Sequence, residues 1–401
     1  MLSNRQLFLH FLGQTSPSPL MLEIESADGV YLYGTDGKKY FDLISGVSVS
    51  NVGHNHLKVV KAIKDQVDSY THLMVYGELI MSPQVRYARH LAEILPAALN
   101  TCYFVNSGSE AVEGALKLAK RFTRRTRIIS FRNAYHGSTH GALSIQGSET
   151  YRNAFRPLLP DIFQIDFNDE NSLNRIDDKT ACVIVEPIQG EAGVILPRGA
   201  FLNKIRSRCD ETGALLIFDE IQTGMGRTGY MFATIRYNVV PDIILLAKAL
   251  GGGMPLGAFI SSNKIMSVLA SDPPLGHITT FGGHPVCCAA GDAALSVIIE
   301  EKLAEKCNLK SALFKEKLKH HLISEVRGEG LLLAVQLTDR VFVPYIVANA
   351  HRYGLIIDFF LFCDRALRLA PPLIITEDEI ILACRLLLDL LDDASENAIM
   401  K

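Results

Sequence analysis

Short apolar runs alternate with amphipathic stretches through the middle of the chain, from residue 56 to about residue 298. The run at 102–105 has the length of a buried strand, and apolar residues between 112 and 119 follow it at helical spacing. Runs of this kind, interleaved with helices, predict an α/β fold whose mostly parallel sheet is covered by helices on both faces. Further strands are predicted at 127–131, 162–166, 181–185, 214–218 and 242–246.

The two ends of the chain have a different pattern. Near the start, short strands are predicted at 29–33 and 40–43. Late in the chain, a charged helix at 300–322 is expected to lead to a strand at 330–335, and then to a helix, a strand and a last helix. This pattern indicates a second, smaller α+β unit. The predicted divisions are an N-terminal segment at 1–55, a large domain at 56–298 and a C-terminal part at 299–401.

Composition narrows the class of protein. A chain of 401 residues that is 48% hydrophobic can build a large core, and a net charge of −3 argues against a nucleic-acid-binding surface. The eight cysteines contain no C-x-x-C pair, which is typical of reduced thiols in the cytoplasm. No apolar run is long enough to span a bilayer, and the start lacks the features of a signal peptide. We therefore expect a cytoplasmic protein that binds neither nucleic acid nor membranes.

The most informative pair of residues is a carboxylate and a lysine at two predicted strand ends. An apolar run ends in Asp219 and Glu220, and Lys248 comes just after the strand predicted at 242–246. A buried carboxylate can hold a protonated heterocycle, and a desolvated lysine can be a neutral amine that condenses with an aldehyde. Pyridoxal phosphate (PLP) requires both groups. The pair predicts a PLP enzyme in which Asp219 and Lys248 are catalytic.

Small polar residues at 106–111 lie between a predicted strand and a predicted helix. Free backbone N–H groups at a helix N-terminus bind anions, and Ser107 and Ser109 add hydroxyl groups. The alternative is an ordinary serine N-cap. Because Asp219 and Lys248 point to PLP, a site for the cofactor phosphate is favoured.

Two further loops contain residues that are suited to a cofactor site. Tyr135 follows a predicted strand and can stack on a flat ring, although a plain loop tyrosine is the alternative. The neighbouring His136 lies four residues before His140, but no third ligand accompanies this pair, so no metal site is expected. Glu186 and Glu191 lie just beyond another strand, and a buried strand-end carboxylate needs a partner. Solvation in a loop is the alternative, and it suits Glu191 better than Glu186.

The run at 224–229 matches G-x-G-x-x-G, the pattern of a dinucleotide site. Such a site needs the glycines to open a helix and an acidic residue at the end of the next strand. Here the residues at 230–232 do not form a helical pattern, and Asp242 precedes its strand. A nicotinamide site is therefore not expected.

Taken together, these segments resemble the class III (ω-amino) aminotransferases, which are PLP enzymes of fold type I. The resemblance covers nearly the whole chain and implies that the two termini together form the smaller α+β domain. The segments that carry it are 53–56, 106–111, 186–191, 218–224, Lys248, 279–283 and 368–372.

For the cofactor, the resemblance implies that Lys248 forms the covalent link to PLP and moves the reacting proton. Asp219 would pair with the pyridinium nitrogen, Gln222 would bond the 3′-oxygen, and Tyr135 would stack on the ring. The amides of Gly108 and Ser109 would hold the phosphate. The remaining residues expected to contact the cofactor are Ser107, His136, Glu186 and Thr280.

For the substrate and the assembly, the resemblance implies a homodimer in which Thr280 reaches the phosphate of the neighbouring subunit. Arg368 would bind a substrate α-carboxylate, and Glu191 would pair with Arg368 when an ω-amine is presented instead. Ser138 stands where ornithine, acetylornithine and 4-aminobutyrate enzymes usually have an arginine, and serine cannot make that charged fork. Val47 stands where ornithine enzymes have an aromatic residue. Both departures weaken an ornithine or acetylornithine assignment without excluding either. The run at 135–144, together with 151–152 and 155–160, resembles the putrescine type most.

The expected reaction is transfer of a terminal amino group from a diamine or ω-amino acid, similar to putrescine or ornithine, to a 2-oxo acid. The acceptor is expected to be 2-oxoglutarate, with pyruvate left open. The nearest alternative is an acetylornithine or 4-aminobutyrate aminotransferase. A glutamate-semialdehyde-type aminomutase, which moves nitrogen within one molecule, is a more distant possibility. The presence of both Lys248 and Asp219 argues against a non-enzymatic binding protein of the same fold.

Overall fold

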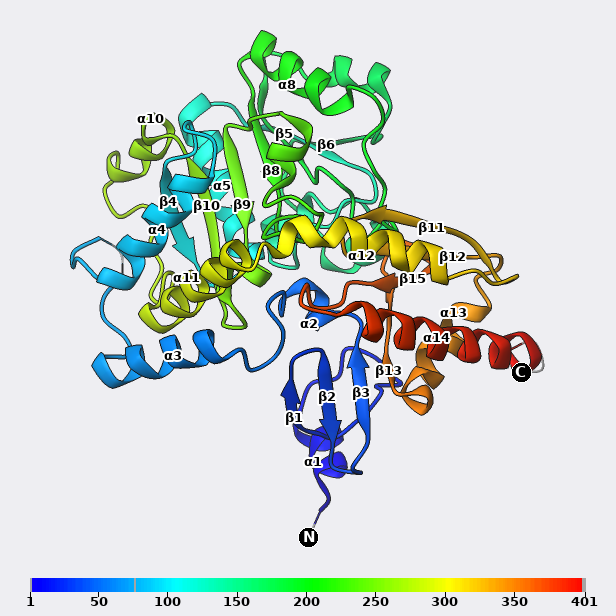
Figure 1. The fold of residues 1–401 in the computed structure, drawn as a ribbon. Coiled ribbons are helices and arrows are strands. Elements are labelled where there is room, and N and C mark those ends of the chain that lie inside the picture. Colours follow the sequence, from blue (N-terminus) through cyan, green and yellow to red (C-terminus); the bar gives the residue numbers. More distant parts are fainter. Residues whose placement is uncertain (1, 76, 399–401) are drawn as a thin grey trace.

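The computed structural model describes residues 2–75 and 77–398, and a seven-stranded sheet lies at its centre (Figure 1). The strand order is β4-β10-β9-β8-β7-β5-β6. The four pairs from β9 to β6 are parallel, whereas β10 runs antiparallel to both of its neighbours. The bounds are β4 Thr101–Val105, β5 Arg127–Phe131, β6 Ile162–Ile165, β7 Thr180–Val185, β8 Leu215–Asp219, β9 Ile243–Leu246 and β10 Gly257–Ser261.

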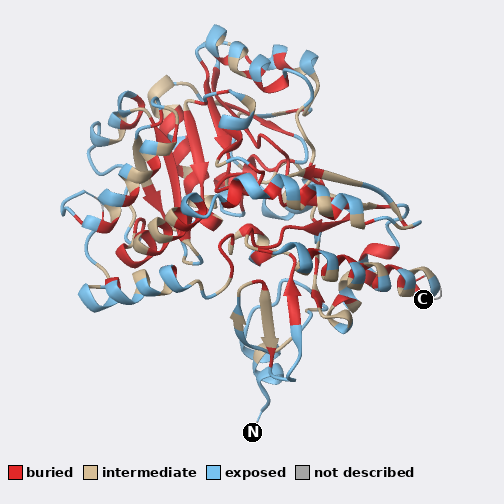
Figure 2. Ribbon diagram, in the orientation of Figure 1, coloured by how far each residue is buried: buried red, intermediate tan, exposed pale blue. Residues whose placement is uncertain are grey.

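The middle strands of this sheet are apolar along their whole length because both of their faces are covered. Every residue of β7, β8 and β9 is buried, and the buried sheet lies between layers of partly exposed helices (Figure 2). This is the burial pattern of a parallel sheet inside two helical layers. The predicted fold class is confirmed.

Helices of the large domain pack on the two faces of the sheet. On one side α5 (Gly108–Thr123) contacts β9 and β10, and a Cβ atom at Gly114 would lie only 2.3 Å from the Phe259 ring. A helix this close to the sheet requires glycine at that point. The other helices here are α3 Leu57–Ser69, α4 Ser82–Ile94, α6 His140–Ser144, α7 Glu149–Arg152, α8 Phe201–Thr212, α9 Ala233–Tyr237, α10 Asn263–Met266 and α11 Pro285–Glu300.

The two ends of the chain share a small sheet of order β1-β2-β3-β13, in which β13 runs parallel to β3. A second small sheet has the order β11-β12-β15-β14. The strand bounds are β1 Ile24–Asp28, β2 Tyr31–Gly34, β3 Lys39–Asp42, β11 Ile323–Glu329, β12 Leu332–Leu337, β13 Leu355–Ile356, β14 Asp358–Phe360 and β15 Cys363–Leu369. The helices are α1 Asn4–Phe11, α2 Ser45–Ser48, α12 Leu303–Lys317, α13 Phe342–Asn349 and α14 Glu377–Asn397.

The charged helix predicted at 300–322 is present as α12, Leu303–Lys317, but it is shorter than predicted. The helix α11 ends at Glu300, Lys302 has φ +52°, and a separate helix α12 ends at Lys317. Strand β11 follows and was not predicted, because its polar, partly exposed sequence lacks an apolar run. The boundaries at 55/56 and 298/299 remain predictions, and α11 spans the second of them.

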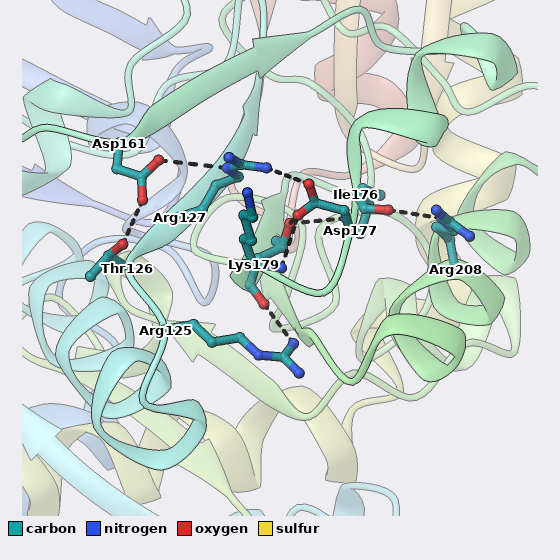
Figure 3. Close-up of polar contacts among 9 residues, drawn as sticks. Arg125, Thr126, Arg127, Asp161, Ile176, Asp177, Lys179 and Arg208 are labelled. Carbon is teal, nitrogen blue, oxygen red and sulfur yellow. Dashed lines mark hydrogen bonds and ion pairs between the residues drawn. The ribbon is translucent and has the colours of Figure 1, made fainter.

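Polar side chains fasten the edge of the sheet where the parallel strands begin (Figure 3). Arg127 at the start of β5 pairs with Asp161 and Asp177, which lie just before β6 and β7. Arg125 donates to the carbonyl oxygens of Thr180 and Thr212 at 3.0 and 2.9 Å. These contacts tie three strand beginnings together, and the opposite edge, where the same strands end, carries the chemistry described below.

Among the described residues, no helix combines the length and the apolar character that crossing a membrane would require.

Candidate active site

A cavity of about 750 Å³ lies at the edge where β7, β8 and β9 end. Parallel strands bring their carboxyl ends to one edge, which is where α/β folds bind ligands. Lys248 is the only lysine or arginine that lines the cavity in the described part of the chain. The other polar lining residues are Asn106, Ser107, Ser109, Tyr135, His136, Ser138, Thr139, Glu186, Asp219, Gln222 and Thr223.

Lys248 begins a short 3₁₀ turn, Lys248–Gly251, two residues after β9. Its φ is +52°, an uncommon value for a non-glycine residue and one that marks a constrained backbone. Burial lowers the pKa of the Lys248 amine, and the charge of Arg368 lowers it further, although the carboxylates of Glu191 and Asp219 oppose this. A lysine with a lowered pKa has more of the neutral form that attacks a carbonyl.

Asp219 ends β8 and is buried, with one carboxylate oxygen 2.7 Å from Nδ1 of His136. Its other oxygen accepts the N–H of Ile221 at 3.1 Å. Burial by itself lowers the pKa of His136, but the hydrogen bond to Asp219 and the charges of Asp219 and Glu186 outweigh it, so the pKa is raised. The hydrogen bond to His136 fixes the position of the Asp219 carboxylate, which also lines the cavity and can face a cation there.

Glu186 and Gln222 provide polar groups on the same side of the cavity. Glu186 accepts the N–H groups of Tyr135 and Gly190, each at 3.1 Å, and burial raises the pKa of its carboxyl to about 7. The Nε2 of Gln222 is buried and has no partner among the described residues. A buried donor without a partner is costly, so this amide is suited to an oxygen of a bound molecule.

The N-terminus of α5 faces the cavity through Gly108 and Ser109. The Ser107 hydroxyl accepts the Glu110 N–H at 3.2 Å, so this serine is an N-cap as well as a lining residue. Gly137, at φ +126°, lies against Ser109, and a Cβ atom there would be 2.1 Å from the Ser109 hydroxyl. The close approach of two small residues leaves first-turn N–H groups available to an anion.

Arg368 and Glu191 form a buried ion pair with N···O 2.8 Å. The Glu191 carboxylate also accepts the Leu361 N–H at 3.0 Å, and Arg368 donates to the Phe359 carbonyl at 2.9 Å. Nε and Nη1 of Arg368 have no hydrogen-bond partner among the described residues. The arginine therefore retains two donors that a carboxylate could take.

Of three further predicted residues, Ser138 lines the cavity, whereas Val47 and Thr280 do not. Ser138 is exposed and its hydroxyl lies 3.2 Å from that of Tyr135. Val47 is half-buried, but Val49 is the residue of that segment that lines the cavity. Thr280 is exposed and does not line the cavity of its own chain.

Sequence reasoning missed an aromatic group beside this rim. The Phe362 ring lies 6.5 Å from that of Tyr135 and 5.5 Å from that of Tyr151. It comes from the turn between β14 and β15, so only the fold brings it close, and the one available signal was its position six residues before Arg368.

The glycine run at 224–229 opens no helix, and α9 begins only at Ala233. A Cβ atom at Gly226 would lie 3.1 Å from the Leu373 side chain, and one at Gly229 would lie 2.3 Å from Asn308. These glycines allow close packing between segments. The side chains of His136 and His140 have different partners. His140 contacts the Pro157 carbonyl, whereas His136 contacts Asp219.

The chain is similar to known proteins of one family. The family model for class III aminotransferases matches residues 13–391, and the chain belongs to that family. It is 42% identical to an acetylornithine aminotransferase of Methanopyrus kandleri over 358 residues, which cover 88% of this chain and 90% of the relative. An acetylornithine aminotransferase of Methanocaldococcus jannaschii is 40% identical over 367 residues, with 88% and 89% covered.

Solved structures show the same fold. The ornithine aminotransferase of Toxoplasma gondii superposes with a TM-score of 0.91 at 31% identity, covering 98% of this chain and 94% of the other. An ω-transaminase of Pseudomonas jessenii in complex with PMP has a TM-score of 0.89 at 26% identity and covers 97% of each chain. The protein is a PLP-dependent aminotransferase.

The cavity fits PLP on features of this chain alone. The carboxylate of Asp219 and the amine of Lys248 both line it, the N-terminus of α5 can receive a phosphate, and Gln222 offers a buried amide without a partner in the described chain. Its volume lies within the range of small-molecule sites.

The raised pKa of Glu186 predicts a pH-dependent stability. Between its ordinary value of 4.5 and about 7, the unfolded chain releases this proton while the folded chain keeps it, so the free energy of unfolding falls as pH rises through that interval. Glu186→Gln removes the effect. The variant should gain about 1–3 kcal/mol relative to the unmodified protein between pH 5 and pH 8, measured by denaturant unfolding. If the difference in free energy of unfolding between the variant and the unmodified protein is the same at pH 5 and pH 8, the raised pKa of Glu186 is contradicted.

Proposed function

We propose that this aminotransferase takes a terminal amino group from a diamine or an ω-amino acid and passes it to 2-oxoglutarate. The ion pair between Arg368 and Glu191 is the observation that carries the proposal. While it is closed, Arg368 is neutralised and a donor without an α-carboxylate next to its amine can enter. When it opens, Arg368 can bind the α-carboxylate of a 2-oxo acid.

Bound PLP withdraws electrons from the carbon that carries the amino group. Lys248 would hold the cofactor covalently, and its amine would move the proton at the reacting carbon. Asp219, held by His136, would pair with the protonated ring nitrogen. The N–H groups of Gly108 and Ser109 would hold the phosphate, Tyr135 would stack on the ring, and Gln222 would donate to the 3′-oxygen.

Ser138 favours a diamine such as putrescine as the donor. No arginine stands at this rim position, and Lys248, which reacts with the donor amine, is the only lysine or arginine lining the cavity in the described residues. A donor whose far end is a carboxylate therefore finds no cationic partner at this position, whereas a second ammonium group meets the carboxyl group of Glu186, which lines the cavity.

Acetylornithine is the second candidate donor. Two relatives with 42% and 40% identity bear the name acetylornithine aminotransferase. That donor carries both an α-carboxylate and an acylated amine, so this alternative requires a group other than Ser138 to hold the carboxylate.

The exposed position of Thr280 supports a homodimer with shared sites. Thr280 lies on a loop whose apolar side chains Leu275, Ile278 and Phe281 are each at least half exposed. An exposed apolar surface of this kind is typical of a subunit interface, and a second chain placed there could bring its Thr280 to the phosphate.

The role of Asp219 can be tested against its neighbour. Asp219→Asn should retain the cofactor but lose on the order of 100-fold in the rate of amino transfer, because the ring nitrogen loses its anion. Glu220→Gln is the matched control, since Glu220 is equally buried but accepts N–H groups at the start of α9. Single-turnover absorbance of both variants gives the comparison. Near-normal turnover by Asp219→Asn, or an equal loss in both, would show that the pyridinium role is wrong.

Donor choice is tested by mixing the enzyme with one amine at a time and following the loss of the cofactor's visible absorbance. Putrescine should react faster than 4-aminobutyrate and N-acetylornithine. Ser138→Arg should shift the preference toward the carboxylate-bearing donors by about 1–3 kcal/mol, the scale of one charge-assisted hydrogen bond. If the unmodified enzyme already reacts fastest with N-acetylornithine, the diamine assignment is replaced by the second candidate.

Shared sites predict recovery of activity in hybrid dimers. Mixing Lys248→Ala chains with Thr280→Asp chains should give hybrids with one doubly defective and one intact site, and about a quarter of full activity after complete exchange. Mixing Lys248→Ala with Asp219→Asn chains is the control, because each site then keeps one defect and should stay inactive. Proven chain exchange without recovery in the first mixture would rule out the shared site.

A further inference from the structure

Arg227, inside the glycine run at 224–229, is a fully buried arginine. Its guanidinium donates to the carbonyl oxygens of Leu331, at 3.0 Å, and of Pro371, and to the side-chain oxygens of Asn51 and Ser45. All four acceptors are neutral oxygens. A buried cation held only by neutral groups is costly, so a specific constraint must favour its presence.

The charge on Arg227 is retained at neutral pH. Burial lowers the pKa of the guanidinium to about 10, while the negative charge of Asp42 opposes the change. Asp42 is already engaged, since one of its oxygens lies 2.7 Å from Nε2 of His54 and the other accepts the N–H of Ser45 at 2.7 Å. Asp42 therefore acts on the same turn as Arg227.

The turn that Arg227 contacts has a strained backbone. Four consecutive residues have positive φ: Ser45 at 49°, Gly46 at 59°, Val47 at 62° and Ser48 at 65°. This conformation is unfavourable for three of the four, and most of all for the β-branched valine. Such a turn persists only when the surrounding contacts determine it.

The turn and the residues beside it are held by Arg227 and by the segment that follows β15. The Ser45 hydroxyl donates to the Ala370 carbonyl and receives a hydrogen bond from Arg227, while the Ala370 N–H binds the Leu43 carbonyl at 2.7 Å. The Asn51 side chain accepts from Arg227, and its backbone carbonyl accepts the Leu373 N–H at 2.8 Å. The turn leads directly to Val49 in the cavity lining, and Ala370 lies two residues after Arg368.

We propose that Arg227 is a positioning residue for substrate recognition, which holds the left-handed turn 45–48 against the strand end that carries Arg368. The guanidinium fixes the spacing between Val49 and Arg368 without touching the substrate itself. A guanidinium can reach all four oxygens at once because its donors form a rigid planar fork, whereas an ammonium group cannot. The inference rests on the proposed role of Arg368 in binding a carboxylate.

The test measures binding of glutarate, an unreactive dicarboxylate that resembles the acceptor, to the holoenzyme by calorimetry. Arg227→Lys keeps the charge but loses the fork, and Ser45→Ala removes the hydroxyl that accepts from Arg227 and donates to the Ala370 carbonyl at the strand end. Arg125→Lys is the matched control, because Arg125 also donates to two backbone carbonyls, those of Thr180 and Thr212, but where the parallel strands begin. Melting temperature and bound PLP are measured for all three variants.

Both site variants should bind glutarate at least about tenfold more weakly while retaining PLP, whereas the control should lose thermal stability without a change in glutarate affinity. In turnover, the KM for the 2-oxo acid should rise more than kcat falls. If Ser45→Ala binds glutarate as the unmodified enzyme does, or if affinity falls only in proportion to lost PLP, the positioning role is overturned. If the Arg368→Met variant binds glutarate as tightly as the unmodified enzyme does, the proposed role of Arg368 fails instead.

Discussion

The burial of β7, β8 and β9 on both faces is the constraint on which the site depends. Strands with no exposed face cannot carry charge along their length, so their polar residues are confined to the ends. Because the three strands are parallel, Glu186, Asp219 and Lys248 reach the same edge. Burial at this edge then changes their acidity, since it raises the pKa of Glu186 and lowers that of Lys248.

This constraint also explains how much of the protein could be predicted from its sequence. Continuous apolar runs marked the parallel strands, and the polar residue just beyond each run marked its end. Asp219 and Lys248 could be identified as PLP-binding residues because few other cofactors require both a carboxylate and a reactive lysine at neighbouring strand ends. The fold class and the aminotransferase activity followed from those signals together with the family resemblance.

Other features depended on contacts between segments far apart in the chain. Strand β11 has no alternation of apolar and polar residues. Strand β10 is short and begins at Gly257, a few residues after the glycines at 251–253, so its apolar run is hard to recognise in the sequence. The contribution of Val49 rather than Val47 to the cavity depends on four left-handed residues whose conformation comes from Asp42, Arg227 and Ala370. Local sequence does not contain this information, because a non-glycine residue adopts positive φ only under tertiary constraint.

The pairing of β13 with β3 has a consequence for synthesis of the protein. The N-terminal strands leave the ribosome first, but β3 meets β13 only after nearly the whole chain has been made. The sheet of the large domain can assemble in the meantime from strands that are closer together in sequence. During translation β3 is therefore an unpaired edge that is open to wrong partners, and the exposed charges of Lys38 and Lys39 oppose such pairing.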